Sequence, residues 1–146
     1  FTLSGKADRI DRLKDGSYAI IDYKSGGQYA ISGIRNGAYP QLPLEGFMAL
    51  SGAFPGIQAE IIGMAGYWIL SGGAVPGRRT EITNDLNELA QEAGESLTRL
   101  VNVFADENTP YYSLPRADRV PRFNDYTHLA RVQEWTALDE SVEDAA

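Results

Sequence analysis

The sequence contains no cysteine and a single histidine, His128. Without cysteine the chain has no disulfide bond, zinc–thiolate site, iron–sulfur cluster or cysteine nucleophile. Because the chain has a single histidine, a metal centre built from several histidines is excluded as well. These two absences narrow the possible chemistry before any motif is considered.

The chain also lacks a long apolar run. Its most apolar stretch, residues 61–70, is interrupted by glycines, whereas a membrane-spanning helix needs about 18 or more apolar residues in succession. The 146 residues are 43% hydrophobic and 23% charged, which is typical of one soluble globular domain. We therefore expect a single domain and no membrane partner.

Basic residues are in deficit. Thirteen Lys and Arg stand against twenty Asp and Glu, and the net charge is −7. This balance argues against a domain that holds nucleic acid by a basic surface of its own. Four of the acids lie between Asp139 and Asp144, so much of the excess belongs to the C-terminal end.

The first half of the chain predicts a β-hairpin followed by a helix. Asp15-Gly16 lies between two strand-like runs, and the second run, 18–24, is rich in β-branched and aromatic residues. Residues 25–40 predict a loop or a short irregular helix. A helix is then expected from about Pro43 to Ser51, with Gly52 after its last turn.

The second half predicts a buried strand and a long helix. Residues 59–70 are expected to form the central strand, and a short strand is possible near 79–82. Apolar residues at helical spacing predict a helix over 84–105, with Thr83 as its N-cap. We assign residues 1–110 to the core. Residues 111–146 are assigned to an extended arm, a short helix near 125–135 that contains His128, and an acidic tail of the same domain.

Charged residues converge on one point of the predicted hairpin. Asp22 and Lys24 are two residues apart, so on a strand their side chains point to the same face. Counting back from the Asp15-Gly16 turn places Asp8 close to cross-strand register with Asp22. Buried charges need partners, and two neighbouring carboxylates are suited to a hard divalent cation such as Mg²⁺ or Mn²⁺. With a lysine beside them, they predict metal-assisted phosphodiester hydrolysis.

Three segments carry a family resemblance: GKADRID at 5–11, IDYKSG at 21–26 and QLPL at 41–44. They resemble the RecB-type branch of the PD-(D/E)XK nuclease superfamily, and most closely the C-terminal nuclease domains of the AddB family. The resemblance implies an α/β (α+β) restriction-endonuclease-like core with a mixed central sheet flanked by helices. The family's N-terminal helix would fall upstream of Phe1, so we expect a piece of a longer chain.

The resemblance also implies residue roles. Asp8 and Asp22 match the metal-binding acids, and the Tyr23 carbonyl is a further ligand of Mg²⁺ or Mn²⁺. Lys24 matches the catalytic lysine, and Gln41 matches a glutamine that contacts DNA or positions that lysine. The family usually has a tyrosine four residues after this glutamine, where the present chain has Glu45.

The implied partners are single-stranded DNA and an AddA-like helicase–nuclease subunit. Together they would act in double-strand break repair in the bacterial cytoplasm. Weaker candidates for DNA contact are the aromatic and basic residues of the arm, Tyr111, Arg116, Arg119 and Arg122. The alternative for these four residues is packing of the arm on a partner subunit or on its own domain.

Two other hypotheses for the whole domain stay open. It can be a catalytically inactive nuclease fold that binds DNA or serves subunit assembly, or a stand-alone nuclease of the Cas4 type. The absence of cysteine argues against the Cas4 type and excludes the iron–sulfur cluster that some AddB proteins carry.

Overall fold

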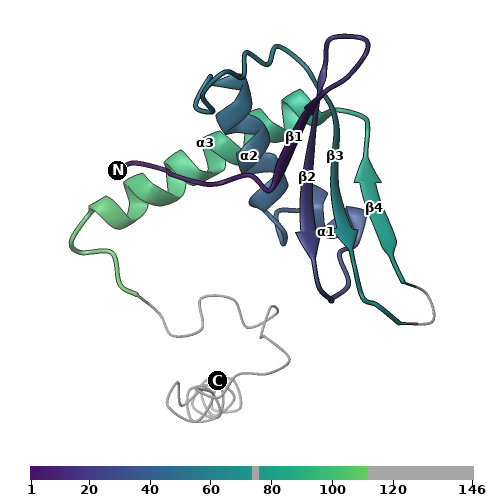
Figure 1. The fold of residues 1–146 in the computed structure, drawn as a ribbon. Coiled ribbons are helices and arrows are strands. Elements are labelled where there is room, and N and C mark those ends of the chain that lie inside the picture. The colour runs from purple at the N-terminus through teal and green to yellow at the C-terminus, as the bar shows by residue number, and fades with distance from the viewer. Residues whose placement is uncertain (74–75, 112–146) are drawn as a thin grey trace, which may run out of the picture. The chain divides into compact units, whose positions relative to one another are not determined.

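The structure, a computed structural model, describes residues 1–73 and 76–111 (Figure 1). Within this part the chain folds into a four-stranded sheet and three helices. Two compact units are distinguished, Phe1–Val103 and Phe104–Ala146. The elements in chain order are β1 (Arg9–Arg12), β2 (Tyr18–Lys24), α1 (Ile31–Arg35), α2 (Gln41–Leu50), β3 (Ile62–Ile69), β4 (Arg78–Ile82) and α3 (Leu86–Ala105).

The sheet is mixed, with the strand order β1-β2-β3-β4. β1 and β2 are antiparallel, β2 and β3 are parallel, and β3 and β4 are antiparallel. The first pair is closed by the predicted turn, in which Gly16 takes a φ of 89° that a residue with a side chain rarely adopts. The predicted α/β class and mixed sheet are thus confirmed.

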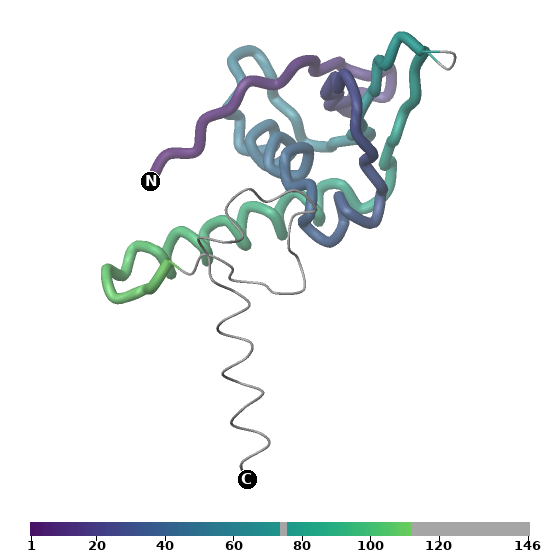
Figure 2. The backbone as a smooth tube through the Cα atoms, turned by 90° about the horizontal axis from the view of Figure 1, so that it is seen from below, coloured from purple at the N-terminus to yellow at the C-terminus, as the bar shows by residue number. Residues whose placement is uncertain are grey.

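Two parallel neighbours require a crossover connection, and α1 and α2 lie in the connection between β2 and β3. α2 lies between the sheet and α3, as Figures 1 and 2 show. A Cβ atom at Gly46 of α2 would lie 3.3 Å from Ala90 of α3 and 4.0 Å from Ile20 and Ile62 of the sheet. The small residue allows α2 to approach both layers closely, and this brings the start of α2 over the end of β2.

The core is formed on the face of the sheet that meets the helices. Ile20 of β2 and Tyr67 of β3 are almost fully buried there. Because side chains alternate along a strand, Asp22 and Lys24 follow Ile20 onto this same face. The sequence pattern therefore carries two charged groups to the edge of the hydrophobic core.

Several predicted boundaries are wrong by a few residues. α2 begins at Gln41, two residues before the predicted start, and β3 is shorter than the predicted strand 59–70. Thr83 is not the N-cap of the long helix. That helix begins at Leu86 after Asp85, whose φ is 59° and whose carbonyl accepts the first helical hydrogen bond, from the backbone N–H of Leu89 at 2.9 Å.

Some predictions fall outside the described residues. These are the arm beyond Tyr111, the helix near 125–135 and the acidic tail. Among the residues that are described, no helix combines the length and the hydrophobicity needed to cross a membrane.

Candidate active site

The hairpin register places Asp8 and Asp22 opposite each other. Arg9 pairs with Ile21 across the antiparallel strands, so the next residue pair outward is Asp8 and Asp22. Asp8 Oδ2 accepts a hydrogen bond from the backbone N–H of Tyr23 at 3.0 Å. Asp8 is therefore a neighbour of Asp22 across the hairpin at the end of β2, in the register that counting from the turn predicted.

Asp22 and Lys24 form an ion pair on the core side of the sheet. The Lys24 Nζ lies 2.7 Å from Asp22 Oδ2, and the exposed fractions of the two side chains are 25% and 4%. Asp22 Oδ2 is buried and has no hydrogen-bond partner among the described residues besides the Lys24 ammonium. This oxygen is thus held by Lys24.

Gln41 bridges the ion pair from the start of α2. Its Oε1 accepts a hydrogen bond from Lys24 Nζ at 2.9 Å, and its Nε2 donates to Asp22 Oδ1. Asp22, Lys24 and Gln41 form a closed triangle of contacts, made from the end of a strand and the first turn of a helix. Such a network holds each member in one orientation.

Two tyrosine rings surround the Lys24 ammonium. Its Nζ lies 5.5 Å from the ring centre of Tyr67 and 5.9 Å from that of Tyr29, within the range of cation–π attraction. Partial burial favours the neutral amine, but the hydrogen bond and charge of Asp22 outweigh it, so the pKa of Lys24 is raised above 10.5. Lys24 is therefore a cation at neutral pH. Burial, together with the charge of Asp22, raises the pKa of Tyr67 to about 12, which keeps that phenol neutral.

The donor set is suited to a hard divalent cation. Asp8 and Asp22 offer carboxylate oxygens, and the buried Oδ2 of Asp22 already lies against a cationic group, the Lys24 ammonium. No cluster of three or more His, Cys, Asp or Glu with metal-binding spacing exists among residues 1–73 and 76–111. Mg²⁺ is commonly held by one or two carboxylates, with water and substrate phosphate completing its shell, so the two acids fit this ion.

Sequence comparison agrees with this geometry. The model of the PD-(D/E)XK nuclease superfamily matches residues 1–118, which is most of the chain. The chain belongs to this superfamily. The fold described above is accordingly a PD-(D/E)XK nuclease fold, and the segment Asp22-Tyr23-Lys24 has the D-x-K pattern of the superfamily's name.

Curated relatives match over a shorter segment. Three of them are subunits of the ATP-dependent helicase/deoxyribonuclease of Streptococcus agalactiae, from serotypes Ia, V and III, and each is 51% identical over 41 residues. The match covers 27% of this chain and 4% of each relative. No solved structure matches the chain significantly.

Two residues of the site were missed by the sequence analysis, and a third, Glu45, was noted there only as a departure from the family pattern. Tyr29 and Tyr67 lie beside Lys24, and Glu45 accepts a hydrogen bond from Gln41 Nε2 at 3.1 Å. Tyr67 pairs with Asp22 across the parallel strands β2 and β3. The sequence does not give the register between these two strands, so this pairing could not be predicted from it. The contact of Glu45 with Gln41 could have been predicted, because residues four apart in a helix are neighbours on its surface.

Asp11 and Tyr111 make contacts of other kinds. Asp11 forms an ion pair with Arg9, at 2.7 Å on the surface. Tyr111 is exposed, and its ring stacks on Phe104 with the ring centres 4.7 Å apart. Arg116, Arg119 and Arg122 lie outside the described residues, so their proposed DNA contact stays a prediction.

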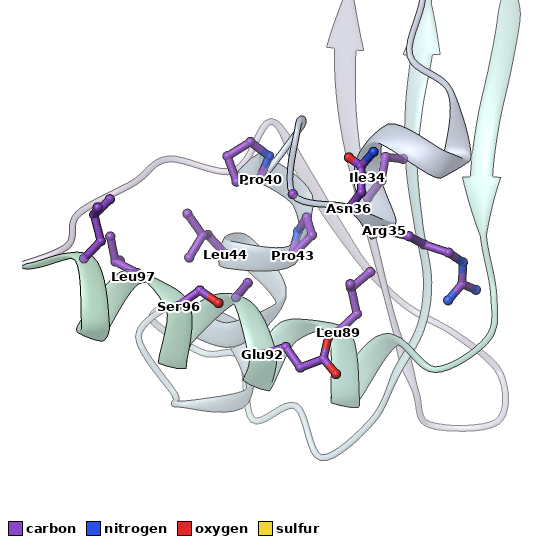
Figure 3. A pocket seen from close by; sticks show the side chains of 13 residues that line it. Ile34, Arg35, Asn36, Pro40, Pro43, Leu44, Leu89, Glu92, Ser96 and Leu97 are labelled. Carbon is purple, nitrogen blue, oxygen red and sulfur yellow. The ribbon is translucent and has the colours of Figure 1, made fainter. Parts of the chain in front are cut away.

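A groove of about 440 Å³ lies between α3 and the α1–α2 region (Figure 3). Its walls are mainly apolar, with Pro43 and Leu44 on one side and Leu89 and Leu97 on the other. It contains none of the residues predicted to be catalytic. The groove is thus separate from the Asp22–Lys24–Gln41 contacts at the end of β2.

Proposed function

We propose that this chain is a metal-dependent deoxyribonuclease domain. The observation that carries the proposal is the convergence of Asp8, Asp22 and Lys24 at the end of β2, with Lys24 Nζ 2.7 Å from Asp22. Two acids and a lysine at one point of a PD-(D/E)XK nuclease fold support phosphodiester hydrolysis.

Each residue then has a distinct role. Asp8 and Asp22 would hold Mg²⁺ or Mn²⁺, with the Tyr23 carbonyl as a further ligand. When bound, the cation lowers the pKa of water and offsets the negative charge of the phosphate. Lys24 is cationic, so it would stabilise the charge that develops on the phosphate oxygens and orient the attacking water. Gln41 accepts from Lys24 and would position it.

The wider setting follows from the partial relatives. Their name combines a helicase with a deoxyribonuclease. We propose that the domain works within an AddAB- or RecBCD-like helicase–nuclease in double-strand break repair, in the bacterial cytoplasm. A helicase and an AddA-like partner subunit would deliver single-stranded DNA and supply a basic track, because this chain has a net charge of −7.

The test is Mg²⁺-dependent degradation of single-stranded DNA by the full-length protein in complex with its partner subunit. Asp22→Asn is expected to abolish cutting and leave ATP-driven unwinding intact. Asp11→Asn is the matched control, because Asp11 is on the neighbouring strand in a surface ion pair. Cutting by Asp22→Asn at the rate of the control would contradict the proposal and favour a non-catalytic nuclease fold.

A further inference from the structure

Glu45 is an acid in an unusual environment. Only 6% of its surface is exposed, and among the described residues the buried polar or charged set contains just Glu45, Asp22 and Ser17. Acids are rarely buried to this degree unless they are paired. Glu45 has no basic partner at ion-pair distance in the described part of the chain, so another reason for its burial is needed.

The contact of Glu45 is with the amide of Gln41. Gln41 Nε2 donates to Glu45 Oε1 at 3.1 Å and to Asp22 Oδ1 as well. An ionised carboxylate only accepts hydrogen bonds, so two acids on one side of the amide require its NH₂ group to face them. The Gln41 carbonyl oxygen is thereby turned toward Lys24 Nζ, from which it accepts at 2.9 Å.

Packing alone does not explain why an acidic residue is buried at position 45. Its second oxygen, Oε2, is buried without a hydrogen-bond partner, and an aliphatic side chain of similar size would avoid that unfavourable desolvation. The same desolvation disfavours the charged form of Glu45 and so raises its pKa. A group that is kept at such a cost is a candidate for a functional role.

We infer that Glu45 is a positioning residue, which holds the Gln41 amide and, through it, the Lys24 ammonium in one orientation. The inference rests on the proposed nuclease function. Asp22 is a proposed metal ligand, so its oxygens are shared between the cation and Gln41. Glu45 also accepts from Gln41 Nε2 but is not a proposed metal ligand. Its oxygen can therefore hold the amide whether or not the cation is bound.

The first test compares cutting by Glu45→Leu and Glu45→Gln in the full-length protein. Leu removes the acceptor, whereas Gln keeps an amide oxygen that can accept from Gln41. Misplaced catalytic groups lose about 10- to 100-fold in rate, so we expect a loss of this size in kcat for Glu45→Leu, with KM for DNA nearly unchanged. Glu45→Gln is expected to restore most of the rate.

A double-mutant cycle with Gln41→Met separates positioning from a merely structural effect. If Glu45 acts through Gln41, Glu45→Leu will lower kcat in the wild-type background and will have no further effect in the Gln41→Met background. Independent losses that add in the double variant would overturn the inference. If Glu45→Leu fails to fold, Glu45→Ala, which also removes the acceptor, replaces it in the same cycle with the same expected result.

Two measurements do not depend on cutting. In the 146-residue chain, the side-chain amide NMR signals of Gln41 are expected to move in Glu45→Leu and to stay near their wild-type positions in Glu45→Gln. The affinity for Mn²⁺ is expected to be unchanged in Glu45→Leu. Unmoved amide signals, or a loss of Mn²⁺ affinity as large as in Asp22→Asn, would overturn the positioning role. If the wild-type protein binds Mn²⁺ and does not cut DNA, the proposed function fails while these measurements still decide the role of Glu45.

Discussion

Two ion pairs of nearly equal length lie on opposite faces of the same sheet. Arg9 and Asp11 approach to 2.7 Å on one face, and Lys24 and Asp22 approach to 2.7 Å on the other. The first pair is 44% and 37% exposed, whereas the second is 25% and 4% exposed. Distance alone does not distinguish them, but burial does.

The difference in burial changes what each ion pair contributes to stability. A surface pair contributes little to stability, because water screens it and the side chains lose freedom. A buried pair must repay the desolvation of both charges and is often no better than an apolar pair. The Arg9–Asp11 pair is ordinary surface chemistry, whereas the Asp22–Lys24 pair is retained at a cost and points to function.

The largest expected difference is in DNA cutting. Lys24→Met removes a cationic donor from the proposed site, and the loss of one such donor lowers kcat by about 10²- to 10³-fold. Arg9→Met removes a cation from the other face and is expected to leave kcat unchanged. The measurement is single-turnover degradation of single-stranded DNA at saturating Mg²⁺. Equal rates for the two variants would remove the functional distinction between the pairs.

The second expected difference is in stability. Lys24→Met leaves the buried Asp22 without its partner, and an unpaired buried polar group costs about 1–3 kcal/mol in the free energy of unfolding. Adding Asp22→Leu is expected to recover most of that loss, because both charges are then absent. Urea unfolding of the two variants and of Arg9→Met tests this. A loss in Arg9→Met as large as in Lys24→Met would show that burial does not separate the pairs.

The smallest expected effect is the pH dependence of stability that comes from Glu45. Burial raises its pKa above the ordinary value of 4.5 in the folded state, so the folded protein binds this proton more tightly than the unfolded chain does. The contribution of Glu45 to stability therefore falls as pH rises from about 4.5 toward neutrality. The glutamine of Glu45→Gln does not titrate. The melting temperature of this variant minus that of the wild type should therefore increase as the pH rises over this range. A constant difference between the two would contradict the buried-acid account.

Local pattern predicted much of this fold. The Asp15-Gly16 turn and the alternation along 18–24 were enough to predict the hairpin and to place Asp8 near Asp22. The 3.6-residue spacing predicted the long helix, although Asp85 rather than Thr83 precedes its first turn. Such boundaries depend on backbone conformation at single residues, which a periodic pattern does not report.

The missed part of the site depends on contacts between distant segments. Tyr67 reaches Lys24 through the parallel register of β2 and β3, and Tyr29 reaches it from the loop before α1. Glu45 was noted at the position of a family tyrosine, but its burial and its bond to Gln41 depend on how α2 packs on the sheet. The contacts of the two tyrosines have no signature in spacing along the chain. The spacing of Glu45 from Gln41 predicts their proximity on a helix and does not report the burial of Glu45.

The central claim is that Asp8 and Asp22 together hold a divalent cation beside Lys24. Calorimetric titration of Mn²⁺ into the 146-residue chain tests it most directly, with Asp8→Asn, Asp22→Asn and the surface control Asp11→Asn measured alongside. We predict one binding event in the wild type and in Asp11→Asn, and none in the other two variants. Binding that survives Asp8→Asn or Asp22→Asn, or that is absent from the wild type, would contradict the claim.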